Sequence, residues 1–181
     1  MTAGTLGKTG TDGHRPPLQI APRLACVVSI MVMQKHQRIA AQTEGLVAAA
    51  GFHPCYLEYF RLFNAQEYYA AHDILEHIWL GSDGECYIFY KALIQFAGGF
   101  VHLQHQHREP GHRVHGKRLH PAARLFRRSA ELLAEVPPRH EGLVIEEIVV
   151  MAISSAESLE NSDFARNPWR PDRAPQLRGP V

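Results

Sequence analysis

The chain has 181 residues, of which 45% are hydrophobic and 20% charged, and its formal net charge is +1 at pH 7. This length suits one globular domain, and the near-zero charge excludes a global field that would draw the protein to nucleic acid or to an anionic membrane. The three cysteines, Cys26, Cys55 and Cys86, lack C-x-x-C spacing, which argues against a disulfide framework and predicts a protein of the reducing cytoplasm.

The first 33 residues are expected to form a leader outside the folded domain. The stretch "GKTGTDGHRPPLQIAPR" is rich in Gly and Pro, as disordered segments are. The apolar run Leu24–Met33 follows two arginines, an arrangement that is also typical of a secretory signal peptide. Three interpretations stay open: a disordered leader, translation that begins at Met31 or Met33, and a secretion signal; we favour the first two over the third. No apolar run approaches the roughly 20 residues that span a bilayer, so we expect no membrane segment.

Residues 34–165 are predicted to fold as an all-α, compact bundle of about five helices with a central antiparallel helical hairpin. Apolar residues recur there at helical spacing, and hardly any segment alternates for long enough to form a strand. A modest first helix is expected over 34–50. A second helix is expected over 53–63, with Pro54 in its first turn, where the missing N–H costs little.

The next two helices form the expected hairpin. The third helix is predicted over 64–80, because Asn64 and Glu67 have the spacing of a capping box. The turn "GSDG" ends it. A long fourth helix is predicted over 85–105.

Two further helices complete the prediction. One begins at Pro121, with its arginines on the outward side, and is broken by "VPPRHEG". The last is expected over 143–160, with glutamates on its solvated face. Residues 166–181, rich in proline, are expected to form an extended tail.

Two polar residues interrupt the apolar side of the third predicted helix. On a helical wheel His72 lies inside the apolar arc and Glu76 lies on its flank, one turn further along. Asp73 and His77 point away from this arc and are therefore expected at the surface.

A polar stripe also follows the long fourth helix. Apolar residues spread almost all the way round this helix, so we expect it to be central. Lys91, Gln95, Gly98 and His102 nevertheless cluster within about 60° of one side. The glycine removes bulk there, either for a close helix crossing or for a ligand. Because a four-residue turn joins the two helices, they should pack antiparallel and bring both polar stripes together.

The sequence therefore predicts one internal site built from five polar side chains. They are His72, Glu76, Lys91, Gln95 and His102. Burying an unpaired charge is costly, so Glu76 is expected to pair with Lys91 or with a histidine.

The stretches "FNAQEYYAAHDILEHIWL" and "FYKALIQFAGGFVHLQ" resemble domain-of-unknown-function family 309, which is found in bacteria and archaea. The family pattern is F-N-x-x-x-[FY]-[FY]-x-x-H-[DE]-x-L-E-x-x-W, followed by G-L-I-Q and a downstream histidine. The matching residues are Phe63, Asn64, Tyr68, Tyr69, His72, Asp73, Leu75, Glu76, Trp79, Leu93, Ile94, Gln95 and His102. Ala92 stands where the family usually has glycine. The resemblance covers roughly Tyr56 to Trp169 and implies an all-helical bundle with no established activity.

Three functions remain open for the predicted site. A carboxylate beside an imidazole can have a strongly shifted pKa, so His72 or Glu76 would act as a base while Lys91 and Gln95 bind an oxygen of a small-molecule ligand. Alternatively, the polar network only fixes helix packing in a structural or interaction module. Thirdly, His72, Glu76 and His102 would supply two imidazoles and a carboxylate to zinc or iron.

The loop after the long helix is rich in histidine and arginine. Histidine-rich tracts bind nickel, copper or zinc weakly, but the basic residues here disfavour cations and favour a solvated loop. The basic patch continues to Arg127 and Arg128 without aromatic interleaving or a recognition motif, so we do not expect nucleic-acid binding. The sequence leaves homo-oligomer formation open.

Overall fold

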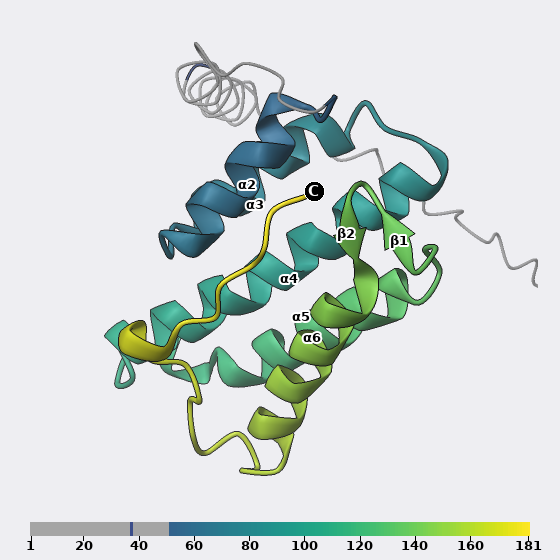
Figure 1. The fold of residues 1–181 in the computed structure, drawn as a ribbon. Helices are drawn as coiled ribbons and strands as arrows, with labels where there is room; N and C mark the ends of the chain where they lie inside the picture. Colours follow the sequence, from purple (N-terminus) through teal and green to yellow (C-terminus); the bar gives the residue numbers. More distant parts are fainter. Residues whose placement is uncertain (1–36, 38–50) are drawn as a thin grey trace, which may run out of the picture. The chain divides into compact units, whose positions relative to one another are not determined.

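The computed structural model describes Gln37 and residues 51–181. The leader expected over 1–33 and, apart from Gln37, the helix expected over 34–50 lie outside the described residues. The described part confirms a predominantly helical fold (Figure 1). Its helices are α2 (Pro54–Asn64), α3 (Tyr68–Trp79), α4 (Gly84–Arg108), α5 (Leu119–Leu133) and α6 (Ile145–Glu160), with short 3-10 turns η1 (His115–Lys117) and η2 (Pro171–Arg173).

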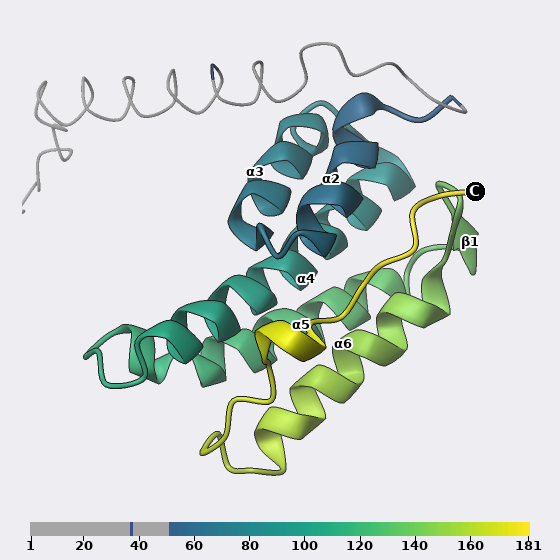
Figure 2. The same cartoon turned by 60° about the vertical axis from the view of Figure 1, so that its left-hand side comes forward.

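Helix α4 is the centre of this part of the molecule. It packs against α3 and α5, while α2 packs on α3 and α6 on α5 (Figure 2). Most of its apolar side chains are buried, and Phe89, Leu93 and Phe96 completely so, as expected for a helix that is apolar nearly all round. Among the helices of residues 51–181, none is both long and apolar enough to cross a bilayer.

The α3–α4 pair is antiparallel, as predicted. The ring of Trp79, at the end of α3, lies 5.1 Å from the ring of Tyr87, at the start of α4. The middle of α3 lies beside the middle of α4, because the His72 side chain is close to the Cα atom of Gly98.

The α4–α5 crossing depends on Gly99. A Cβ atom at this position would lie only 2.4 Å from Cε1 of Phe126, a fully buried ring of α5. The hydroxyl of Ser129 also donates a 2.9 Å hydrogen bond to the carbonyl of Ala92. Close backbone approach at this crossing therefore requires a residue without a side chain.

The predicted capping box at the start of α3 is wrong. Asn64 ends α2, and the residue before α3 is Glu67, whose side chain makes no capping hydrogen bond. The Asn64 side chain instead binds the backbone of Leu177, donating to its carbonyl at 2.9 Å and accepting from its N–H at 2.8 Å. Local spacing cannot distinguish a helix cap from a bond to a distant segment that offers the same backbone groups.

The proline-rich segment 166–181 packs along the helices instead of leaving them. Trp169 and Leu177 are buried, and the indole N–H of Trp169 donates to the hydroxyl of Tyr68 at 3.1 Å. Figure 1 shows this segment, in yellow, running back past α4 to end beside the β-hairpin. There the N–H of Val181 donates to the carbonyl of Gly142 at 3.4 Å.

A small hairpin precedes α6 where the sequence predicted only a helix break and an earlier helix start. Strands β1 (Arg139–His140) and β2 (Leu143–Val144) pair antiparallel around Glu141 and Gly142. Both turn residues have positive φ, at 47° and 74°, which is the geometry of a tight two-residue turn. Strands of two residues are too short for an alternating pattern to reveal them.

Candidate functional site

The two predicted polar stripes meet at His72 and Gly98. A Cβ atom added to Gly98 would lie 4.0 Å from Cδ2 of His72 and 3.3 Å from Cδ1 of Leu125. The glycine of the stripe therefore allows both neighbouring helices to approach α4 closely.

His72, Asp73 and Glu76 form a cluster on α3. Their ligand atoms all lie within 4.8 Å of one another. Nδ1 of His72 is 3.5 Å from Oδ1 of Asp73 and 4.0 Å from Oε2 of Glu76. The His72 and Glu76 side chains are 33% and 29% exposed, and that of Asp73 is only 6% exposed.

The expectation that Asp73 lies at the surface is therefore wrong, whereas His77 is exposed as expected. A helical wheel shows which face of a helix is polar. It does not show that other parts of the fold cover Asp73, which lies outside the apolar arc.

The other three predicted residues make separate contacts. Nζ of Lys91 lies 5.6 Å from the centre of the Tyr87 ring, in cation–π geometry. Gln95 is half-buried on α4. Nδ1 of His102 accepts a 2.9 Å hydrogen bond from Nη1 of Arg118, since an arginine can only donate.

Arg118 affects both the pKa and the hydrogen bonding of His102. Burial, reinforced by the positive charge of Arg118, lowers the pKa of His102 to about 4. His102 is therefore neutral at pH 7, and its Nδ1 is already occupied by a donor. The group on α3 whose ligand atoms lie within 4.8 Å of one another contains Asp73, whereas the metal hypothesis from the sequence named His102 beside His72 and Glu76.

A second cluster was not identified from the sequence. Sγ of Cys86 lies 3.7 Å from Nε2 of His140 and 3.7 Å from Oε1 of Glu141. Burial raises the pKa of the Cys86 thiol, and the negative charge of Glu141 raises it further. No local pattern could have indicated this cluster, because Cys86 lies in the first turn of α4 while the other two residues belong to the β-hairpin.

A third cluster lies in the histidine-rich loop. Nδ1 of His115 is 2.7 Å from Oε2 of Glu109, and the tilted rings of His112 and His115 have centres 4.3 Å apart. The hydrogen bond from His115 lowers the pKa of Glu109. Glu109 and His112 are exposed, in keeping with the solvated loop that the sequence favoured.

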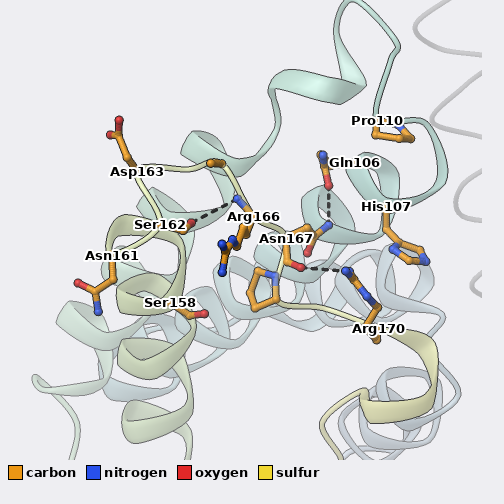
Figure 3. A pocket seen from close by; sticks show the side chains of 12 residues that line it. Gln106, His107, Pro110, Ser158, Asn161, Ser162, Asp163, Arg166, Asn167 and Arg170 are labelled. Atoms are coloured by element: carbon orange, nitrogen blue, oxygen red, sulfur yellow. Dashed lines mark hydrogen bonds between the residues drawn. The ribbon is translucent and has the colours of Figure 1, made fainter.

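A large cavity among the described residues is lined by no residue of the three clusters. It measures about 1240 Å³ and is bordered by the end of α4 and by the segment that follows α6 (Figure 3). Its lining includes Gln106, His107, Ser158, Asn161, Ser162, Arg166, Asn167 and Arg170. Three smaller cavities of the described part have other linings, and none of the four includes a residue of the predicted polar site.

Comparison with known proteins gives one match. Residues 56–114 match the model of a family described as "Domain of unknown function (DUF309)". No curated protein and no solved structure matches the chain. The matched segment contains the whole α3 cluster and Cys86, whereas His140 and Glu141 lie beyond it. Residues 56–114 thus match the same family that the sequence resembles.

Proposed function

We propose that this protein binds a divalent metal ion through His72, Asp73 and Glu76. The observation that carries the proposal is the convergence of one imidazole nitrogen and two carboxylate oxygens within 4.8 Å. This ligand set suits zinc, ferrous iron or manganese. All three residues belong to the segment that matches the family model.

The spacing of the ligand atoms supports the proposal. With metal–ligand bonds of about 2.0–2.2 Å, neighbouring ligand atoms in one coordination shell lie about 3.0–3.5 Å apart. The separation of 3.5 Å between His72 Nδ1 and Asp73 Oδ1 meets this requirement, and the 4.0 Å separation to Glu76 Oε2 requires only a small side-chain rotation.

The environment of the imidazole also supports a metal. Nδ1 of His72 is sheltered from solvent and makes no hydrogen bond with a described residue, because the 3.5 Å contact to Asp73 is an ion-pair distance without hydrogen-bond geometry. A sheltered polar atom without a hydrogen bond costs about 1–3 kcal/mol. The His72 side chain as a whole is 33% exposed, so the site lies near the surface while its ligand atom is kept from bulk water.

A metal held by three protein ligands keeps coordination positions for water or for an oxygen of a small molecule. A metal site is therefore compatible with the small-molecule ligand that the sequence analysis considered. That ligand would be a compound whose carboxylate or carbonyl oxygen binds the metal. In this arrangement Glu76 and Asp73 also supply the negative charge that attracts the cation.

The test is a titration of the tag-free, full-length protein with Mn²⁺, followed by the electron paramagnetic resonance signal of the free ion. We expect about one tight site per chain, lost in His72→Ala and in the isosteric Asp73→Asn. His77→Ala removes an exposed imidazole from the same helix and should bind Mn²⁺ as the natural protein does. Undiminished binding by Asp73→Asn, or no binding of Mn²⁺, Zn²⁺ or Fe²⁺ by the natural protein, would refute the proposal.

A second candidate function is binding of a small anion in the large cavity. Arg166, Arg170 and His107 line it (Figure 3), and guanidinium groups are well suited to carboxylate and phosphate. Inorganic phosphate should then raise the melting temperature of the natural protein and of Arg178→Gln, an exposed control, but not that of Arg166→Gln. An equal rise in all three proteins would point to a nonspecific salt effect.

A further inference from the structure

The cluster at the base of the β-hairpin joins two distant parts of the chain. Cys86 lies in the first turn of α4, His140 ends β1, and Glu141 is the first turn residue of the hairpin. The His140 ring packs edge-on against Phe89, with centres 4.9 Å apart. The hydroxyl of Tyr56 donates a 2.8 Å hydrogen bond to the carbonyl of Glu141. Contacts with the helices therefore hold both hairpin residues, His140 and Glu141, in place.

The distances within the cluster match a tetrahedral zinc site. With Zn–S of about 2.3 Å and Zn–N or Zn–O of about 2.0–2.1 Å, tetrahedral angles place sulfur about 3.6 Å from each lighter ligand atom. The Sγ atom of Cys86 lies 3.7 Å from Nε2 of His140 and 3.7 Å from Oε1 of Glu141. Both distances from the sulfur thus already have the required spacing, and the three ligand atoms all lie within 4.8 Å of one another.

Glu85 occupies the position of a supporting carboxylate. Its Oε2 lies 3.8 Å from Nδ1 of His140, on the side of the ring opposite the nitrogen that faces Cys86. Metal-bound histidines commonly direct their second nitrogen to a carboxylate, which fixes the tautomer and orients the ring.

The electrostatics of the cluster also favour a cation. A carboxylate beside the sulfur opposes a free thiolate, so the cluster cannot easily form a nucleophilic Cys–His pair. A divalent ion between the three groups would remove this repulsion, because opposite charges would then alternate.

We infer that Cys86, His140 and Glu141 form a zinc site, with Glu85 as its outer carboxylate. The inference is independent of the proposed site on α3: it concerns other residues and a softer ligand set. Since His140 and Glu141 lie outside the segment matched by the family model, the site is not contained in that segment. On binding, the thiol releases one proton and its sulfur forms a bond to zinc, with no change of oxidation state.

The test uses Co²⁺ as a probe, because a cobalt–thiolate bond gives a charge-transfer absorption in the near ultraviolet. In a tag-free Cys26→Ser/Cys55→Ala protein, Cys86 is the one remaining cysteine. We expect Co²⁺ to produce the absorption and Zn²⁺ to abolish it by displacement. Cys86→Ser should remove the absorption entirely. Failure of the single-cysteine protein to give the absorption would overturn the inference.

Glu141→Asn is the variant that separates binding from folding. Asparagine tolerates the positive φ of this turn position better than glutamate, so the metal-free melting temperature should not fall. We expect zinc affinity to fall by about tenfold or more, and a fall of about 10–100-fold in Glu85→Gln. Unchanged zinc affinity in both variants would contradict the site.

The two proposed sites fail separately. Asp73→Asn should abolish tight Mn²⁺ binding and leave the cobalt–thiolate absorption intact, while Cys86→Ser should do the reverse. Loss of the cobalt absorption in Asp73→Asn, with the protein still folded, would show that Cys86 has a different partner and would overturn the hairpin site alone.

Discussion

The α3 cluster and the hairpin cluster differ in how the chain brings their ligands together. His72, Asp73 and Glu76 come from five consecutive residues of one helix, whereas Cys86 is 54 and 55 residues away from its two partners. The first arrangement exists wherever α3 is helical. The second exists only when the hairpin is packed against α4. The i, i+4 pair of His72 and Glu76 can therefore be read from sequence spacing, whereas the burial of Asp73 and the hairpin cluster cannot.

The comparison also predicts different sensitivities to damage. The hairpin cluster depends on a few contacts, such as that of Tyr56 with the turn, whereas the α3 cluster depends on helix formation and on α4 beside it. Substitutions that loosen the fold should weaken the hairpin site before they weaken the α3 site.

The largest effect is expected from Gly99→Ala. The new methyl group would overlap the buried ring of Phe126, which lowers the free energy of unfolding by about 3 kcal/mol. The higher helix propensity of alanine raises it by about 1 kcal/mol. The net loss in free energy of unfolding is about 2 kcal/mol, measurable by urea denaturation. Gly111→Ala, at an exposed glycine with no neighbour within 4 Å, is the control. Equal stability of the two variants would show that the crossing is looser than described.

Tyr56→Phe should separate the two sites. It removes the hydrogen bond to the Glu141 carbonyl and leaves a part-buried acceptor without this donor, which costs about 1 kcal/mol. Zinc affinity should fall, because the turn is less firmly held, while Mn²⁺ affinity stays the same. Tyr59→Phe, which removes a 3.2 Å bond to the carbonyl of Leu93, is a matched control and should change neither affinity. A parallel fall in zinc affinity in both variants would reflect general destabilisation only.

Asn64→Asp tests local capping against the long-range contact. Aspartate caps helices as well as asparagine does, so a capping role predicts no loss of stability. In the structure the substitution removes the donor to the Leu177 carbonyl and places a charge beside it, at a cost of about 1 kcal/mol. Thermal denaturation at pH 7 measures the difference. An unchanged melting temperature would favour the local role.

The smallest effect concerns His102. Its pKa of about 4 in the folded protein lies below the ordinary value of 6.5, so the unfolded chain binds the proton first as the pH falls. Stability is therefore complete above about pH 6.5 and falls as the pH is lowered toward 4. Because the side chain is only half-buried, this contribution is about 1 kcal/mol after allowance for solvent screening.

In His102→Asn this part of the acid destabilisation should disappear, because asparagine retains an acceptor for Arg118 and does not titrate. Urea denaturation at pH 7 and pH 5, with and without Mn²⁺, measures it. A pH effect present only without metal would assign His102 to the metal site instead of to Arg118.

The sequence predicted the helices better than their junctions. Helix α4 was expected over 85–105 and spans Gly84–Arg108, because its apolar periodicity is long and uninterrupted. The start of α3 was misplaced because Asn64 suits a cap, and its true partner, Leu177, lies far along the chain.

The candidate site divides in the same way. The i, i+4 spacing placed His72 beside Glu76 correctly, since the helix alone fixes it. The spacing could not reveal that Asp73 is buried, that His102 pairs with Arg118, or that Cys86 meets the hairpin. Each of these depends on which surface packs against which, and no local pattern records that information.

The most direct measurement is the electron spin echo of Mn²⁺ bound to the tag-free protein, which detects nitrogen coordinated to the ion. We predict coupling to one imidazole nitrogen, retained in His77→Ala and in Cys86→Ser and absent in His72→Ala. Coupling that persists without His72, or bound Mn²⁺ without any coupled nitrogen, would contradict a metal centre on α3.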